Sequence, residues 1–217
     1  MPQFEAVKPF LLRPLHMIRT ALEFVRKTLE SYMVEREQDS SYALGNVVDL
    51  KSIVLPNGTI DITDTTHITI MLVGIDEERR EGKRPQYVPT DDRQFLRLNA
   101  PLEIDLHVLF VAHNKSYTTA LRDLSDVLGF FQSNPVFDST RYPALNATVA
   151  DPDQKPWQLV TRLLFALLSL TFEQQNNLWA ILGSKYMPSV VYRVKMLTVF
   201  ETKSQEKVAS VSELQLR

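Results

Sequence analysis

The sequence predicts an α/β fold of the α+β type, in which a single mixed, largely antiparallel sheet is flanked by helices. Residues 15–32 place an apolar side chain at every third or fourth position, which is the periodicity of an amphipathic helix. Residues 66–75 are rich in β-branched residues and apolar on both faces, as in a strand that is covered on two sides. Residues 101–112 alternate apolar and polar side chains, as in a strand with one buried face.

The first helix follows an expected N-terminal arm, residues 1–14. Pro2, Pro9 and Pro14 each remove a backbone donor and fix φ, so we expect neither a helix nor a central strand in the arm. Arg26 and Glu30 form an i,i+4 pair that we place on the polar side of the helix. The expected apolar face consists of Leu15, Ile18, Leu22, Val25, Leu29 and Tyr32.

Two strands and a long connection are expected next. Tyr42–Leu50 is short and contains two valines, so we interpret it as a strand. Asn57-Gly58 predicts a tight turn because both residue types tolerate positive φ. The strand at Thr66–Ile75 is expected near the centre of the sheet. Asp76–Ala100 has no clear periodicity and holds the densest charge in the chain, which predicts a projecting loop.

A strand and a helix follow this loop. The strand is Pro101–Ala112, and Asn114 or Ser116 is the expected N-cap of the helix. The helix is predicted to bury a face that consists of Tyr117, Ala120, Leu121, Leu124, Leu128 and Phe131.

The last third of the chain contains a strand, a short helix and a final strand. Leu159–Leu170 is interpreted as a buried strand, although its apolar run also fits a helix. Thr171 and Gln174 have the spacing of a capping box, and Gly183 is the expected left-handed C-cap. Val190–Phe200 is the expected final strand. The chain is therefore divided into an arm (1–14), one domain (15–200) and a C-terminal tail (201–217).

Composition and charge exclude several classes of function. The 217 residues include 24 Lys and Arg against 26 Asp and Glu, a net charge of −2, so no bulk field attracts nucleic acid or an anionic membrane. The chain has no cysteine, which excludes disulfides, thiolate zinc sites and a cysteine nucleophile. The longest apolar stretch, Leu163–Leu168, is far shorter than the roughly 20 residues that cross a bilayer. We expect no nucleic-acid partner and no membrane partner.

The search for catalytic and metal-binding groups yields one weak candidate. The six glycines never cluster, so the sequence contains no phosphate-binding loop. Glu103, Asp105 and His107 alternate on one strand, with His113 and His67 as further nitrogen ligands if all five converge on zinc or manganese. The same alternation is the ordinary pattern of a half-solvated strand, and we favour that interpretation. The sequence therefore predicts no catalytic residue, no metal and no cofactor.

The charge run in the long loop is the best candidate for an interface. A loop of this length is either a docking element or a solvated connection, and both interpretations stay open. Trp179, Tyr186 and Tyr192 are aromatic residues that fit a core better than an interface. The interface candidates are Glu77, Glu78, Arg79, Arg80, Glu81, Lys83 and Arg84.

Three sequence blocks resemble one family. Ser169–Leu197 (SLTFEQQNNLWAILGSKYMPSVVYRVKML) resembles the C-terminal signature of the tail-terminator, or cap, family of extracellular contractile injection systems, of the virulence-cassette and antifeeding-prophage type. Phe130–Phe137 (FFQSNPVF) is similar to a second block. Ile18–Met33 (IRTALEFVRKTLESYM), followed by Tyr42–Leu50 (YALGNVVDL), is similar to a third. The blocks occur in the family's order and span about residues 15–200.

The resemblance implies a structural protein rather than an enzyme. It implies a tail-terminator-like fold and a homo-hexameric ring on the inner tube and the last sheath ring, which ends polymerisation and couples tube to sheath. The implied partners are the inner-tube protein and the sheath protein. The implied location is the bacterial cytoplasm during assembly, and then a released or cell-associated contractile particle. Another baseplate or adaptor component of the same machine is the alternative, and a metal-dependent hydrolase is the less favoured one.

Overall fold

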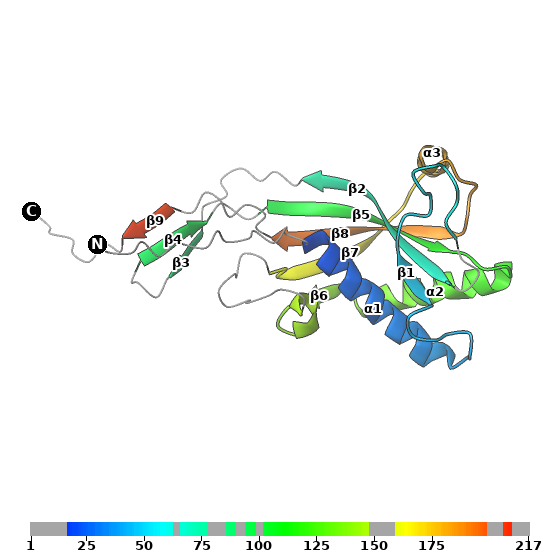
Figure 1. The fold of residues 1–217 in the computed structure, drawn as a ribbon, viewed down its shortest axis with the longest axis horizontal. Coiled ribbons are helices and arrows are strands. Elements are labelled where there is room, and N and C mark those ends of the chain that lie inside the picture. Colours follow the sequence, from blue (N-terminus) through cyan, green and yellow to red (C-terminus); the bar gives the residue numbers. More distant parts are fainter. Residues whose placement is uncertain are drawn as a thin grey trace, which may run out of the picture.

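A six-stranded sheet forms the centre of the molecule (Figure 1). The computed structural model describes residues 17–62, 66–77, 86–89, 94–98, 102–147, 159–198 and 206–209. In the sheet, β1 runs parallel to β2 and every other neighbouring pair is antiparallel. The strand order is β1 (Val48–Leu50), β2 (Ile68–Glu77), β5 (Leu102–Ala112), β8 (Ser189–Thr198), β7 (Arg162–Leu168) and β6 (Val136–Asp138). The predicted mixed, largely antiparallel sheet is confirmed.

The described helices cover both faces of this sheet. They are α1 (Met17–Glu37), α2 (Tyr117–Ser133), α3 (Phe172–Leu182) and the short 3-10 helix η1 (Pro143–Asn146). Helices α1 and α2 pack on the face that carries Leu106, Val108 and Phe110 of β5. Because side chains alternate along a strand, Leu109 and Val111 point to the opposite face, where they pack against Trp179 of α3. The larger core therefore lies under α1 and α2, and a smaller one lies under α3.

The larger core is unusually aromatic. Phe131 of α2 stacks on Phe165 of β7 with ring centroids 4.4 Å apart, and Phe130 packs near Phe137 at 5.9 Å. Tyr192 of β8 lies 4.5 Å from Phe131. Aromatic pairs of this kind add roughly 0.5–1.5 kcal/mol each beyond the area they bury. They fix α2 against β7 and β8.

Helix α1 buries one acidic side chain that the sequence analysis placed on its polar side. Glu30 does pair with Arg26, at 3.3 Å, but its other carboxylate oxygen accepts hydrogen bonds from the backbone N–H groups of Gly45 and Val47 at 3.0 and 3.2 Å. The side chain is buried because it satisfies backbone donors of the turn before β1. The apolar face of the helix is otherwise confirmed within the described residues.

The positions and lengths of some strands differ from the prediction. The strand expected at Tyr42–Leu50 is limited to β1, because its first half forms the turn that Glu30 holds. β2 is the second strand of the sheet, whereas β5 and β8 occupy the centre. β2 is apolar on both faces because its first half lies between the two cores.

A second, three-stranded sheet occupies segments that were expected to be a loop and a tail. Strands β3 (Gln86–Pro89) and β4 (Gln94–Leu98) form an antiparallel hairpin within Asp76–Ala100. Strand β9 (Glu206–Ala209) pairs antiparallel with β4. This long-range pairing has no local sequence signal, which explains why periodicity did not predict it.

Helix α2 is rotated relative to the predicted apolar face. Ser116 is its N-cap, as expected, and Ala120 and Phe131 are buried. Tyr117, Leu121 and Leu128 are exposed instead. The buried stripe is completed by Asp123, Asp126, Val127 and Phe130. The prediction failed because two of the buried positions are acidic, and acidic residues are almost never buried unless they are paired.

Candidate assembly surfaces

The charged interface candidates lie at and beyond the end of β2. Glu77 is the last residue of β2 and is exposed. The other candidates lie outside the described residues; they are Glu78, Arg79, Arg80, Glu81, Lys83 and Arg84. Their role as a docking element therefore stays a prediction.

The candidate metal ligands do not converge. Glu103, Asp105 and His107 share one face of β5, as predicted, but His107 Nε2 lies 3.4 Å from Asp76 Oδ2 of β2. Asp105 Oδ2 lies 3.8 Å from Arg193 Nε of β8. The face is a set of cross-strand charge pairs, which stabilise a sheet. Within the described part of the chain, no three His, Cys, Asp or Glu side chains are grouped so that they could hold a metal ion.

His67 and His113, the two remaining candidates, belong to buried hydrogen-bonded groups. His67 Nδ1 lies 3.0 Å from Asp123 Oδ2, and His113 Nε2 lies 3.0 Å from Thr69 Oγ1. Burial lowers the pKa of His113, and the nearby Lys51 adds to this effect. His113 is therefore held in its neutral form inside the fold.

Asp123 is the centre of a polar cluster that joins α2 to the turn before β1 and to the start of β2. Its Oδ1 accepts a hydrogen bond from the Tyr42 hydroxyl, and that hydroxyl accepts one from Arg122 Nη2 at 2.6 Å. Burial, reinforced by the hydrogen bond to Asp123, raises the pKa of Tyr42. Arg122 also contacts Glu37 of α1 at 3.1 Å. The cluster fixes the rotation of α2 and so decides which side of the helix faces solvent.

Asp126 forms a second link between α2 and α1. Its Oδ1 lies 2.9 Å from Arg36 Nε. Burial raises the pKa of Asp126 to about 6, and the neighbouring carboxylate of Glu37 adds to the shift, whereas Arg36 opposes it. A buried carboxylate beside a second one favours its protonated form.

The rotation of α2 leaves an apolar stripe on its outer side. Tyr117 is 64% exposed, and Leu121 and Leu128 are also exposed. Leu124 is half-buried and packs partly against the larger core, and with it these residues are spaced by four, three and four positions, which is the spacing of a helix–helix seam. We call these four residues the α2 stripe. An exposed apolar stripe of this kind is a candidate surface for contact with another chain.

A second apolar surface lies on the opposite face of the sheet, around α3. Phe172 is 92% exposed and Ile181 is 84% exposed, whereas Trp179 between them is buried. Tyr186, just after the helix, is exposed, and its ring lies 5.9 Å from that of Trp179. The expectation that Trp179 and Tyr192 are core residues is confirmed; for Tyr186 it is wrong, because that ring covers only the edge of the smaller core.

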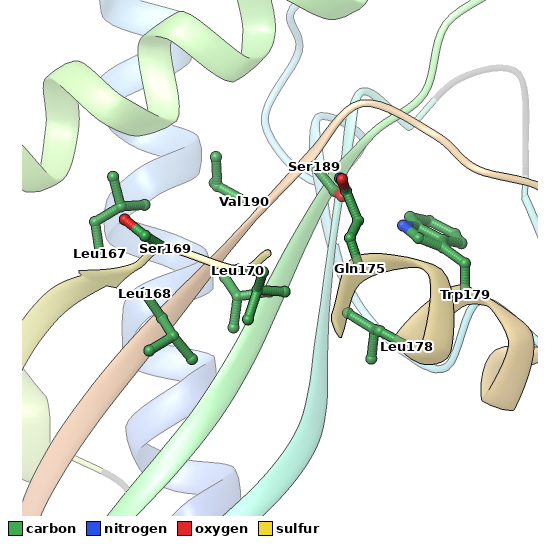
Figure 2. Close-up of a pocket in the computed structure, with 10 residues that line it drawn as sticks. Leu167, Leu168, Ser169, Leu170, Gln175, Leu178, Trp179, Ser189 and Val190 are labelled. Atoms are coloured by element: carbon green, nitrogen blue, oxygen red, sulfur yellow. The ribbon is translucent and has the colours of Figure 1, made fainter. Parts of the chain in front are cut away.

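A hollow of about 220 Å³ adjoins this surface (Figure 2). It lies between the first turns of α3 and the neighbouring ends of β7 and β8, and Gln175, Leu178 and Trp179 contribute from the helix. The local sequence explains the position of α3. Its capping box at Thr171 and its left-handed C-cap at Gly183 are both formed, as predicted, so the helix has fixed ends.

Sequence reasoning missed both apolar surfaces. On α2 the signal was present, because the helix carries apolar residues on two faces and only one can pack on the sheet. On α3 no local signal separates Trp179, which is buried, from Phe172 and Ile181, which are not. None of the described helices combines the length and apolar character that a membrane-crossing helix requires.

Comparison with protein families gives one match. The family described as the Pvc16 N-terminal domain matches residues 20–213. A search of the curated proteins finds no match.

The solved structures that are similar in fold include two terminator proteins. The first is the PVC sheath/tube terminator in its extended state, from an extracellular contractile injection system, with a TM-score of 0.58 and 13% sequence identity. The second is the tube-terminating cap of the anti-feeding prophage, with a TM-score of 0.51 and 14% identity. The similarity covers 92% of this chain but only 62% and 60% of the other two, so the chain spans about three fifths of their length. The first neighbour is described as a terminator of sheath and tube, and the second as a cap that terminates a tube.

Proposed function

The chain belongs to the Pvc16 N-terminal domain family, and from this membership we propose that it is a structural terminator of a contractile injection system. The observation that carries the proposal is the agreement of two independent comparisons. The family covers nearly the whole chain, and the fold is that of a sheath/tube terminator and of a tube-terminating cap. The tail-terminator resemblance of the sequence blocks points to the same function.

The working form is a homo-hexameric ring. A closed ring of identical subunits uses head-to-tail contacts, so each subunit needs two different surfaces that complement each other. The α2 stripe and the exposed side chains around α3 lie on opposite faces of the sheet, and they supply two such surfaces. Six copies match a tube of sixfold symmetry.

Termination needs a face that copies the acceptor surface of the tube and an opposite face that offers none. The inner-tube protein binds the first face, and the last ring of sheath protein binds the periphery, which couples tube to sheath. The run from Glu77 to Arg84, the arm (1–14) and the tail (201–217) are our candidates for these contacts. Such mixed charge favours orientation and fast association more than affinity.

Assembly takes place in the bacterial cytoplasm, and the chain then remains in the released or cell-associated particle. The alternative is another baseplate or adaptor component of the same machine. The terminator is favoured because the two solved structures above are described as a sheath/tube terminator and a tube-terminating cap.

Two experiments test the proposal. Native mass spectrometry and negative-stain images of the purified chain, with and without tube protein, should show rings of six. A chain that stays monomeric with tube present contradicts the ring. Imaging of particles that carry a label on this chain should place it at the end opposite the baseplate. A label at the cell-facing tip overturns the cap and supports the alternative.

The charged loop has its own test. Deletion of Glu77–Arg84 should weaken binding to tube or sheath and leave the fold intact, as judged by circular dichroism. The matched control replaces Lys27 and Glu35, two exposed charged residues of α1, with alanine. If the deletion and the control assemble equally well, the loop has no role in docking.

A further inference from the structure

The hollow beside α3 has the chemistry of a peptide-binding site. Leu168, Leu170, Leu178 and Val191 give it apolar walls, and Ser169 and Gln175 add polar groups. Its volume of about 220 Å³ equals roughly seven water molecules at about 30 Å³ each, which is space for one large apolar side chain. The hollow opens beside Ser169, which is exposed.

A buried donor without an acceptor among the described residues lies beside this space. Trp179 is 4% exposed, and its Nε1 has no hydrogen-bond partner among the described residues. Figure 2 shows the indole nitrogen on the edge of the ring that is turned toward Gln175 and Ser189. A buried indole N–H usually has a partner, because leaving it unpaired is costly. The site therefore lacks one carbonyl-type acceptor.

The exposed ring of Tyr186 packs edge-on against Trp179, with an interplanar angle of 71°. An aromatic pair next to a free indole N–H is suited to an extended, proline-containing segment. Such a segment keeps its carbonyl groups free because it forms no internal hydrogen bonds. It binds at a low entropic cost because its backbone is already restricted.

The arm of this chain has the sequence of a proline-containing segment. Residues 1–14 hold Pro2, Pro9 and Pro14, and the last two enclose the apolar run Phe10–Leu12. The 16 residues before α1 span roughly 50 Å when extended, at about 3.3 Å each. Helix α1 and helix α3 pack on opposite faces of the sheet (Figure 1). Within one copy the arm would have to pass around the sheet to reach α3, which favours the α3 surface of a neighbouring copy as its partner.

We infer that the hollow at α3 binds the arm, residues 1–14, of a neighbouring copy of this chain. One side chain of Phe10–Leu12 fills the hollow, and a carbonyl oxygen of the arm accepts the hydrogen bond from Trp179 Nε1. This inference rests on the proposed ring, because it needs a neighbouring copy. It adds a defined contact by which each subunit ties itself to the next.

Fluorine NMR of the full chain tests this contact. In a Trp157→Phe background, incorporated fluorotryptophan reports on position 179 alone. The triple variant Phe10→Ser, Leu11→Ser and Leu12→Ser should shift the signal to that of an empty hollow. The control variant Glu5→Ser with Lys8→Ser changes only polar arm positions and should leave the signal unchanged. Identical signals in wild type and triple variant overturn the inference.

Mixing distinguishes a neighbouring arm from the chain's own. Labelled triple variant, with an intact hollow, is mixed with unlabelled Leu178→Gln, which has an intact arm and a damaged hollow. The labelled signal should move toward the wild-type position as the unlabelled partner is added. No movement on mixing, together with a wild-type signal that does not depend on concentration, shows docking within one copy and overturns the inference.

A third variant tests the hydrogen bond. Trp179→Phe keeps an aromatic ring but removes the N–H, so association should weaken roughly five- to tenfold, the usual effect of one hydrogen bond. Rings of six without arm docking overturn this inference and keep the proposed function. Concentration-dependent docking in assemblies of another size keeps the inference and overturns the ring. If the chains do not associate at all, both the arm contact and the ring are overturned.

Discussion

Removal of the Tyr42 hydroxyl tests the polar cluster that fixes the rotation of α2. In Tyr42→Phe, Asp123 loses one of its two hydrogen-bond donors, and His67 remains as the other. A hydrogen bond to a charged group contributes roughly 1.5–3 kcal/mol. The lost hydrogen bond between Arg122 and the Tyr42 hydroxyl should cost little stability, because Arg122 is partly exposed and keeps its contact with Glu37. The free energy of unfolding should therefore fall by about 2 kcal/mol, which lowers Tm by roughly 4–8 °C for a domain of this size.

Urea unfolding at pH 7, followed by circular dichroism, measures this change. The matched control is Tyr117→Phe, whose hydroxyl lies on the exposed α2 stripe and should matter by less than about 0.5 kcal/mol. The double variant Tyr42→Phe with Asp123→Asn should show a coupling energy of roughly 1–2 kcal/mol, because the two side chains are in contact. Equal stability of Tyr42→Phe and Tyr117→Phe, or zero coupling, refutes the role given to the cluster.

Three further variants test other parts of the fold. The raised pKa of Asp126 means that the folded state binds its proton more tightly than the unfolded state does, so stability decreases as pH rises from about 4 to about 6. Asp126→Asn should remove this part of the pH dependence in urea unfolding. If the free energy of unfolding changes with pH in parallel for variant and wild type, Asp126 is not its source. Gly183→Ala should lower the free energy of unfolding by roughly 1–2 kcal/mol, because Gly183 has φ of 63°. The control, Gly129→Ala inside α2, should be neutral or stabilising. Equal effects of the two substitutions contradict the role given to the left-handed C-cap. Thr171→Ala should cost about 1 kcal/mol in thermal unfolding through loss of the capping box, and an unchanged Tm excludes that contribution.

The orientation of α2 shows where sequence reasoning failed. Apolar residues occupy two sides of this helix, and the sequence analysis assigned the side with Tyr117 and Leu121 to the core. The side that is buried carries Asp123 and Asp126, whose partners Tyr42, His67 and Arg36 lie on other elements. A buried acid is acceptable only when such partners are present, and no local pattern shows them.

The candidate surfaces divide in the same way. The charged run that begins at Glu77 was visible as a candidate because charge density is a property of the sequence itself. The α3 surface and its hollow were not visible, since they form only when β7, β8 and α3 come together. The sheet of β3, β4 and β9 likewise joins residues that are more than 100 positions apart.

The sequence by itself determined the helices, their caps, the strand at β5 and the family. The helices, caps and strand depend on interactions within about four residues, and the family depends on the order of the sequence blocks along the chain, so all of them can be read from the sequence. Only the tertiary structure decided which side of α2 is buried, which strand is central and where apolar side chains remain exposed. Burial depends on what the rest of the chain brings to each surface, and that is a property of the packed molecule and of no single segment.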